Sequence, residues 1–284
     1  MLCRLIFLSI AIFVSIDKVE SGTCADKVNS CDRAAAYCKL SSLQKTLREN
    51  CAVTCKFCKP TPGSRQKPRP RPPRPGNNLP KYKLHYFNFR FRAEAVRLMF
   101  NYKRVKFEDF KIDPKDWPSL KNNYPNKQIP ALEIDGKMLM ESGSIYRYVG
   151  RKFNLFGKDE VETAFLDSTA ELFRELFDAA TPYIQAKIGV LQNANPDDLF
   201  KNQFEPSLKN VAPQLVKKLG EQRSGFFSSQ LSWVDFYVAD AVFTFNGFVP
   251  QAMQPYPELL QHQKKVYALP ELKQYIANRP TTPL

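Results

Sequence analysis

The residues best suited to covalent chemistry are the cysteines, and all seven lie within the first 58 of the 284 residues. Six of them, from Cys24 to Cys58, follow the spacing C-x6-C-x6-C-x12-C-x3-C-x2-C. The closing C-x2-C also occurs in zinc sites, but this stretch contains no histidine, so three disulfide bonds are the better interpretation and no metal is expected. Cross-links of this kind stabilise a segment that is too short to bury a sufficient core.

The N-terminal sequence predicts that these cysteines are exported to an oxidising compartment. Arg4 precedes an apolar run from Leu5 to Ile16, and small or aliphatic residues follow at 19–21, as in a secretory signal peptide. We therefore expect residues 1–21 to be removed, together with Cys3, and the mature chain to be secreted and extracellular. No later stretch approaches the roughly 20 apolar residues of a membrane span.

The cysteine spacing of residues 22–58, with Asp26 after the first cysteine and Thr54 before the fifth, resembles the ShKT domain. The resemblance implies the pairs Cys24–Cys58, Cys31–Cys51 and Cys38–Cys55. Toxin members of that family block potassium channels with a Lys-Tyr pair, where this chain has Lys45 and Thr46. An adhesive or structural module is therefore favoured over a toxin.

Residues 59–80 form a basic, proline-rich linker. The stretch 59–81 holds eight prolines and seven basic residues without an acid, which is half of the formal net charge of +14. Such a sequence predicts an extended polyproline spacer. Its charge makes a sulfated glycan or cell-surface partner possible, whereas the lack of interleaved aromatic residues argues against nucleic acid.

The cysteine-free remainder predicts an α/β half, residues 81–156, and an all-α half, residues 157–284. Strands are expected at 82–87, 107–110, 131–134 and 138–140, with helices at 92–101 and 142–153 and a short one after Trp117, in the order βαβαββα. Asp135-Gly136 is a strong hairpin signal between the last two strands. Helices at 160–185, 197–219 and 232–248 and a shorter tail complete the second half. Ser232 and Asp235 predict a variant capping box at the start of a buried helix.

Several motifs in this region resemble the glutathione transferases of the sigma class, in their nematode form, over residues 80–284. The resemblance implies a thioredoxin-like α/β subdomain followed by an all-helical subdomain, and a homodimer. The motifs are YKLHYFN at 82–88, RAE at 92–94, DWP at 116–118, QIPALEIDG at 128–136, ESGSIYRY at 141–148, RKF at 151–153 and SWVDFYVAD at 232–240.

The resemblance assigns the central role to Tyr86, at the end of the first strand. Glutathione attacks electrophiles as a thiolate, and a hydroxyl that donates to the sulfur favours this charged form. Without the surrounding motifs, a tyrosine here would be interpreted as a strand residue packed in the core. Glutathione is the co-substrate, and no separate cofactor is expected.

The resemblance also implies how the rest of glutathione is held. Ile129, before a cis Pro130, offers its backbone to the cysteinyl part, and the helix start at Glu141 and Ser142 receives the γ-glutamyl carboxylate. Trp117 and Lys121 hold the glycyl end. Arg92, Gln128 and, from the partner subunit, Glu175 complete the set.

The electrophile pocket is expected to involve Phe89, Phe91 and Phe177. Phe91 stands where the family pattern Phe-Asn-x-Arg-Gly-Arg has glycine. Its ring either fills the pocket or forms a flat platform for a bulky apolar ligand. We therefore expect a secreted glutathione transferase that conjugates electrophiles such as lipid-peroxidation products, with prostaglandin isomerisation as a further possibility. The alternative is a non-catalytic protein that binds glutathione or an apolar ligand and is attached to a surface by the ShKT module and linker.

Overall fold

A computed structural model describes residues 38–39, 42–52, 55–56 and 79–282 of the chain. The chain divides into two compact units, residues 1–78 and 79–284, and each is described by itself. The predicted signal peptide and residues 59–78 of the predicted linker lie outside the described residues. Among the helices that are described, none is long and apolar enough to cross a membrane.

The first unit contains one described helix, α2 (Gln44–Asn50), whose Leu47 is buried against Cys51 and Cys55. Cys38 and Cys55 form a disulfide bond with an S–S distance of 2.03 Å. This confirms one of the three predicted pairs. Cys51 is also in a disulfide bond, but its predicted partner Cys31, and the whole predicted pair Cys24–Cys58, lie outside the described residues.

The second unit begins with a four-stranded sheet in the order β2-β1-β3-β4. β1 (Tyr82–Phe87) is parallel to β2 (Phe107–Ile112) and antiparallel to β3 (Ala131–Ile134), which pairs with β4 (Lys137–Leu139). The β3–β4 turn uses Asp135 and Gly136 at φ values of 48° and 83°, the double positive φ that makes Asp-Gly a hairpin signal. The predicted hairpin is confirmed.

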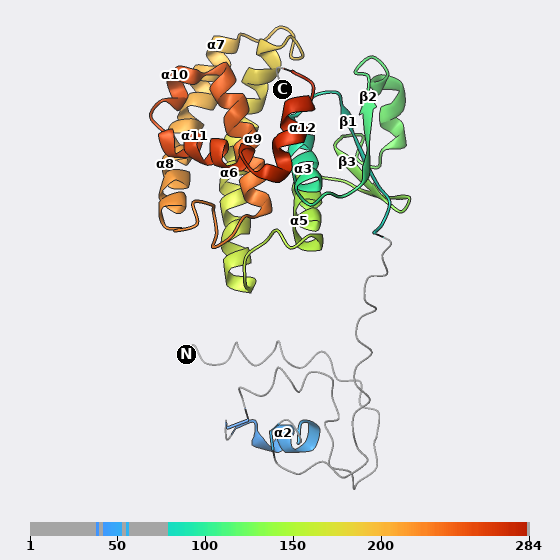
Figure 1. The fold of residues 1–284 in the computed structure, drawn as a ribbon, viewed down its shortest axis with the longest axis vertical. Coiled ribbons are helices and arrows are strands. Elements are labelled where there is room, and N and C mark those ends of the chain that lie inside the picture. The colour runs from blue at the N-terminus through green and yellow to red at the C-terminus, as the bar shows by residue number, and fades with distance from the viewer. Residues whose placement is uncertain (1–37, 40–41, 53–54, 57–78, 283–284) are drawn as a thin grey trace, which may run out of the picture. The chain divides into compact units, whose positions relative to one another are not determined.

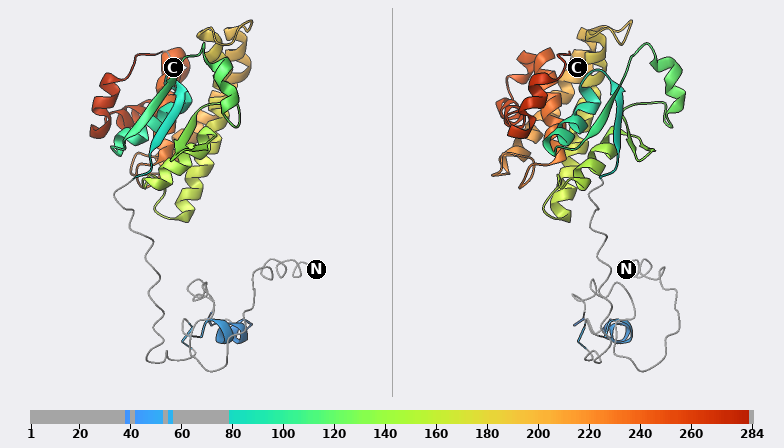
Figure 2. Two further views of the ribbon diagram at one scale, coloured as in Figure 1. Left: turned by 90° about the vertical axis from the view of Figure 1, so that its right-hand side faces the viewer. Right: turned by 45° about the vertical axis from the view of Figure 1, so that its right-hand side comes forward.

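Two helices pack on one face of this sheet, α3 (Phe91–Tyr102) and α5 (Ser142–Lys152), as Figure 1 shows. Because side chains alternate along a strand, Tyr82, Leu84 and Tyr86 enter this core while His85 faces the other side. The segment after β2 holds α4 (Trp117–Leu120) and the single turn η2 (Lys121–Asn123), beyond that other side of the sheet (Figure 2). The order βαβαββα is confirmed, and with it the thioredoxin-like half.

The second half of the unit is helical throughout. Its elements are α6 (Glu160–Lys187), α7 (Pro196–Leu199), η3 (Phe200–Phe204), α8 (Glu205–Gly220), α9 (Trp233–Phe248), α10 (Pro250–Met253), α11 (Pro257–Tyr267), η4 (Pro270–Leu272) and α12 (Lys273–Asn278). The single helix predicted at 197–219 is interrupted by η3, which is a π-helical turn. This wider turn brings Phe200 and Phe204 onto the ring of Tyr183, at 5.5 and 5.7 Å between centroids.

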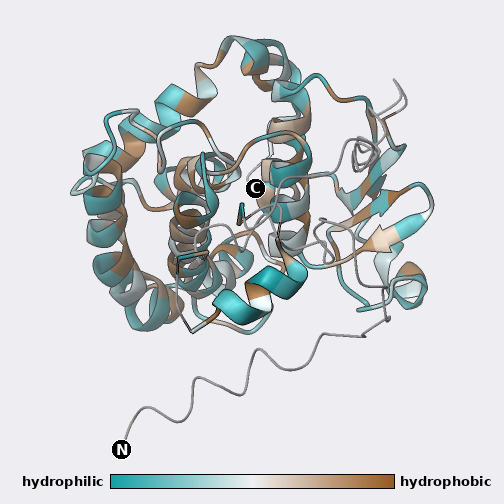
Figure 3. Cartoon of the chain, turned by 90° about the horizontal axis from the view of Figure 1, so that it is seen from below, coloured by the Kyte–Doolittle hydropathy of each residue, from teal (hydrophilic) through white to brown (hydrophobic). Residues whose placement is uncertain are grey.

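Helix α9 occupies the centre of the helical half and packs against α3, α6 and α11. Ser232 and Asp235 form the predicted capping box at its start, which confirms that prediction. The Asp235 carboxylate also accepts the backbone N–H of Phe227 and contacts Nε2 of His262 at 2.9 Å, all of it buried. Figure 3 shows hydrophobic and hydrophilic residues alternating along the outer helices, the pattern of helices with one side in a shared core, whereas α9 is buried along nearly its whole length.

Candidate functional site

A cavity of about 440 Å³ lies where the end of β1, the segment before β3, the start of α5 and the end of α6 converge. Such a volume suits a small ligand. The cavity is lined by seven of the residues predicted to bind glutathione and by five that were not predicted. They are Arg92, Trp117, Gln128, Ile129, Pro130, Glu141 and Ser142, and then Phe87, Lys127, Met140, Thr181 and Gln185.

One wall of the cavity is the segment that leads into β3. The Ile129–Pro130 peptide bond is cis, as the resemblance implied. Ile129 and Pro130 precede the first paired residue of β3, so the backbone of Ile129 lies outside the sheet. A backbone of this kind can accept an extended peptide as an added strand.

A second wall is the start of α5. Glu141 precedes the helix with φ 67°, and its carboxylate accepts a hydrogen bond of 2.7 Å from the Asn126 side chain. Ser142 is the first helical residue, and both it and Glu141 line the cavity. The first N–H groups of a helix have no partner within it and, with the helix dipole, attract an anionic group.

Arg92 closes the end of the cavity nearest α6. Its guanidinium donates to Asp178 at 2.8 Å, lies 3.5 Å from the Thr181 hydroxyl, and stacks 4.8 Å from the centre of the Phe177 ring. Burial alone would lower the pKa of Arg92, but the bond to Asp178 raises it, so the net change is upward. Arg92 is thus a fixed cation that bridges the two halves of the unit.

Tyr86 is almost fully buried, with 3% of its surface exposed, and it is not among the cavity-lining residues. Burial raises the pKa of Tyr86 to about 12, while the charge of Arg92 and a hydrogen bond from the backbone N–H of Arg92 act in the opposite direction. The hydroxyl therefore stays protonated at neutral pH.

None of the three residues predicted for the electrophile pocket lines the 440 Å³ cavity. Phe91 has 8% of its surface exposed and packs on Phe177 with 4.8 Å between ring centroids. Phe89 instead stacks on Phe87 at 5.2 Å. A platform for a bulky ligand needs an exposed ring, so the geometry supports the other interpretation, in which Phe91 fills the pocket.

Phe91 adopts φ 41°, a left-handed conformation that glycine enters freely and a bulky side chain does not. It is the first residue of α3 and follows Arg90, whose guanidinium donates to Asp240 and Thr244 of α9. The backbone at this turn therefore keeps the conformation expected of the glycine that the family pattern has there, although the side chain is a phenylalanine.

Besides Tyr86, two predicted glutathione ligands do not line the cavity. Lys121 is exposed on η2, one turn beyond Trp117, and Glu175 is exposed on the outer side of α6. Thr181 and Gln185, which do line it, were missed. Their only sequence signal is polar character at i and i+4 on a helix, which is also typical of any solvated face.

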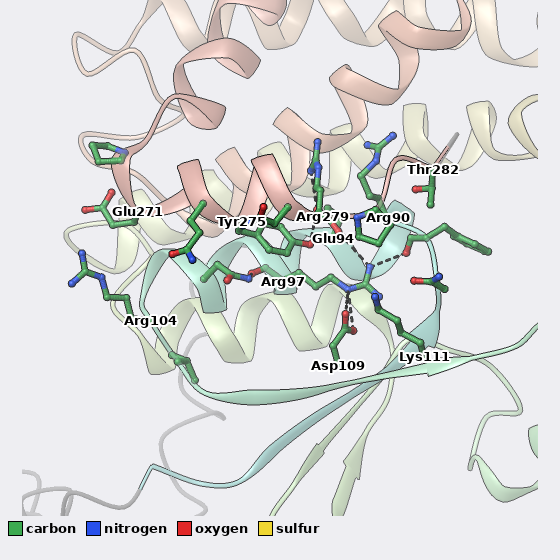
Figure 4. A pocket seen from close by; sticks show the side chains of 18 residues that line it. Arg90, Glu94, Arg97, Arg104, Asp109, Lys111, Glu271, Tyr275, Arg279 and Thr282 are labelled. Atoms are coloured by element: carbon green, nitrogen blue, oxygen red, sulfur yellow. Dashed lines mark hydrogen bonds and ion pairs between the residues drawn. The ribbon is translucent and has the colours of Figure 1, made fainter.

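A second and larger cavity, of about 700 Å³, lies between α3, β2 and the C-terminal segment (Figure 4). Its floor is a buried charge network around Glu94, which accepts from Arg279 at 2.8 Å and Tyr275 at 2.9 Å and pairs with Arg97 at 3.4 Å. Arg97 in turn donates twice to Asp109, at 3.0 and 3.1 Å. Since these charges compensate one another, we interpret the network as the attachment of α12.

Comparison with known proteins agrees with this geometry. The family model described as "Glutathione S-transferase, N-terminal domain" matches residues 82–151, and "Glutathione S-transferase, C-terminal domain" matches residues 177–279. A third, "ShK domain-like", matches residues 23–58. The three matches together span both units of the chain.

Individual relatives cover the second unit. Glutathione S-transferase 1 of Ascaris suum is 34% identical over 206 residues, which are 72% of this chain and all of that protein. Human hematopoietic prostaglandin D synthase is 32% identical over 209 residues, again 72% of this chain and all of that protein. The crystal structure of the glutathione S-transferase from Ascaris lumbricoides superposes with a TM-score of 0.68 at 33% identity, covering 72% of this chain and all of that one. The chain therefore belongs to the glutathione S-transferase family, and it carries an ShK domain in front of the transferase fold.

Proposed function

We propose that this chain is a secreted glutathione transferase of the sigma class that conjugates glutathione to small apolar electrophiles. The observation that carries the proposal is the 440 Å³ cavity, in which Trp117, the backbone before Pro130 and the start of α5 face a common space. These are an aromatic wall, a backbone segment outside the sheet and an anion-binding helix end. A tripeptide with two terminal carboxylates uses all three.

The binding mode follows from these walls. The γ-glutamyl carboxylate binds at the start of α5, where Ser142 adds a hydroxyl, and the cysteinyl part pairs with Ile129. The glycyl end lies against Trp117 and within reach of Lys121. Gln128 and Arg92 border the same space, and Glu175 of the partner subunit meets the γ-glutamyl amine in a homodimer.

Tyr86 activates the thiol in this scheme. A free cysteine thiol has a pKa near ~8.5, so only a few per cent is thiolate at neutral pH. A neutral hydroxyl that donates to sulfur stabilises the thiolate, and the raised pKa of Tyr86 keeps its proton in place for this task. The thiolate then attacks the electrophilic carbon, either displacing the halide of an aryl halide or adding to the double bond of an unsaturated aldehyde, whose enolate takes a proton from water.

Lipid-peroxidation products are the substrates we propose first, because the residues around Tyr86 are aromatic and apolar. The similarity to a protein named hematopoietic prostaglandin D synthase supports isomerisation of a prostaglandin as a second activity. Both reactions need the same glutathione thiolate beside an apolar space.

The alternative function is non-catalytic binding of glutathione or an apolar ligand, and one observation favours it. Phe91 packs on Phe177 inside the core cluster, where the electrophile was expected to bind. In this version the basic linker and the ShK module attach the protein to a sulfated glycan or another surface component, and the cavity only holds its ligand.

Replacement of Phe91 separates the two functions. We expect Phe91→Gly to raise the conjugation rate of a small aryl halide and of an unsaturated aldehyde several-fold, at an unchanged KM for glutathione, because it removes the ring and suits the positive φ. The measurement is steady-state conjugation by the full chain before and after the change.

Phe91→Ala is the matched control, because it removes the ring but keeps a side chain that is strained at this φ. If the conjugation rate rises in both variants, the Phe91 ring is what limits activity in the parent. If it rises in Phe91→Gly alone, the strained backbone is the cause. If parent and both variants are all inactive while glutathione still binds, the transferase proposal fails and the binding protein remains.

A further inference from the structure

Behind the aromatic wall of the glutathione cavity lies a second layer of side chains. Trp117 lines the cavity, and its ring packs against Phe87, which lines the cavity beside it, and against Tyr124, which does not line the cavity. The Phe87 ring meets that of Trp117 edge-on at 5.9 Å, and the Tyr124 ring lies at 5.3 Å with an interplanar angle of 54°. The orientation of Trp117 therefore depends on where Tyr124 is held.

Tyr124 is held by a buried histidine on the central strand. Its hydroxyl lies 3.0 Å from Nδ1 of His85, and Nε2 of His85 lies 3.3 Å from the Glu133 carboxylate on β3. The rings of His85 and Tyr124 also meet edge-on at 5.6 Å. Both residues are buried, so the contact is shielded from solvent.

The partners of His85 fix the direction of each hydrogen bond. An ionised carboxylate only accepts, so Nε2 carries the ring proton and donates to Glu133. Nδ1 of the neutral ring is then an acceptor, and the Tyr124 hydroxyl donates to it. Burial, and secondly the charge of Lys83, lower the pKa of His85, while Glu133 and Glu108 oppose them without reversing the change. The neutral ring is thus the form present near pH 7.

The backbone of Tyr124 joins two parts of the cavity wall. Its N–H donates to the carbonyl of Lys121 at 3.2 Å, and its carbonyl accepts from the N–H of Lys127 at 2.9 Å. Lys121 belongs to the turn after Trp117, and Lys127 lies in the cavity wall beside Gln128. A shift of Tyr124 would therefore move both segments that are expected to hold the peptide.

From these contacts we infer that Tyr124 is a positioning residue which, through its hydrogen bond to His85, sets Trp117 and Lys121 for the glycyl end of glutathione. The inference rests on the proposed function, because it takes Trp117 as a glutathione contact. It adds the hydrogen bond that orients this contact, between His85 of β1 and Tyr124 of the segment before β3.

The direct test is Tyr124→Phe, which keeps the ring but removes the donor. We expect the KM for glutathione to rise roughly three-fold to ten-fold, the effect of losing one hydrogen bond, with kcat at saturating glutathione changed less than about two-fold. Tyr148→Phe is the matched control, since it removes another hydroxyl of the same subdomain, 3.4 Å from that of Tyr82 and outside the cavity lining. An unchanged KM in Tyr124→Phe overturns the inference.

A double-mutant cycle shows whether His85 acts through Tyr124. If the hydrogen bond is what matters, His85→Leu and Tyr124→Phe each raise KM, and the double variant is no worse than the more affected single variant. Additive effects would overturn the coupling. Since the chain has only two histidines, the ¹⁵N shifts of His85 are readily separated from those of His262. Tyr124→Phe should move the Nδ1 shift of His85 and leave His262 unchanged.

Two further measurements distinguish a failure of this inference from a failure of the proposed function. Trp117→Ala should raise the KM for glutathione if Trp117 is a contact, and no change there would overturn the proposed binding mode itself. In acid, protonated His85 no longer accepts from Tyr124, so the ratio of KM between Tyr124→Phe and parent should fall toward one, with a midpoint below the usual histidine pKa of ~6.5. A ratio that stays constant with pH assigns the effect to something other than the histidine.

Discussion

Tyr86→Phe should lower the turnover of an aryl halide by roughly ten-fold or more while the KM for glutathione changes little. We expect the hydroxyl to act on the thiolate alone, because Tyr86 is not among the residues that line the cavity and would hold the peptide. The bound thiol should also titrate closer to the ~8.5 of a free thiol, since each unit of pKa corresponds to ~1.4 kcal/mol of stabilisation of the charged form. In the variant, the rate should therefore continue to rise with pH where the parent has reached its plateau.

Tyr82→Phe is the control for this experiment. It removes a hydroxyl from the same strand and the same face, four residues earlier, where its partner is Tyr148. We expect parent-like turnover from it. Equal turnover in Tyr86→Phe and the parent would remove Tyr86 from its proposed role, and a large rise in KM would assign it to binding instead.

Most residues of the 440 Å³ cavity were predictable because they lie in short motifs near the ends of regular elements. The segment 128–136 contains the wall, the strand and the hairpin in nine consecutive residues, and local geometry fixes how they are arranged. Tyr86 is similar, since its position at the end of β1 follows from the period of two along a strand. Seven predicted residues meet in one cavity for this reason.

The packing of Phe91 was not predictable, because it depends on a neighbour that is distant in sequence. The motif located Phe91 in the turn before α3, but only the position of Phe177 on α6 decides whether the ring is exposed or buried. The same holds for the pair of His85 and Tyr124, which are 39 residues apart. A single sequence shows no signal for a contact between two strand or loop residues at such a separation.

The interruption of the helix predicted at 197–219 has a related cause. The chain is helical on both sides of η3, in α7 and in α8, so the prediction failed only in the type of turn between them. What selects a π-helical turn is the tertiary packing of Phe200 and Phe204 on Tyr183 of α6. Local propensity is overridden where large side chains are buried by a partner element.

The buried network at the larger cavity (Figure 4) leads to the second prediction of large effect. Glu94→Ala should destabilise the folded chain by about 3 to 5 kcal/mol, the usual cost of removing one partner from a buried ion pair. In the described structure, the one acidic partner that Arg279 then keeps is Asp240, at 3.8 Å. The Tyr275 hydroxyl loses its acceptor as well. Glu94 lies on α3, and Arg279, 185 positions later, directly follows α12. Loss of the hydrogen bond between them should therefore loosen the attachment of α12 to α3.

Two variants show which property of Glu94 matters. Burial, and secondly the charge of Asp240, raise the pKa of Glu94, and the two arginines only partly offset this. The charge itself is therefore costly to bury, and Glu94→Gln, which keeps an acceptor oxygen without the charge, should cost less than Glu94→Ala. Glu108→Ala removes a glutamate from the solvent-accessible pair with Lys83, where a loss of at most about 1 kcal/mol is expected.

Urea unfolding of the three variants and the parent measures this order, and proteolysis of the C-terminal segment reports on α12. If Glu94→Ala unfolds within about 1 kcal/mol of Glu108→Ala, the network does not secure α12. In that case the apolar contacts of α12 and η4, such as buried Leu272, must supply the attachment instead. Early cleavage near α12 in Glu94→Ala, intermediate cleavage in Glu94→Gln and none in Glu108→Ala would show that the acceptor oxygens of Glu94 join α12 to α3.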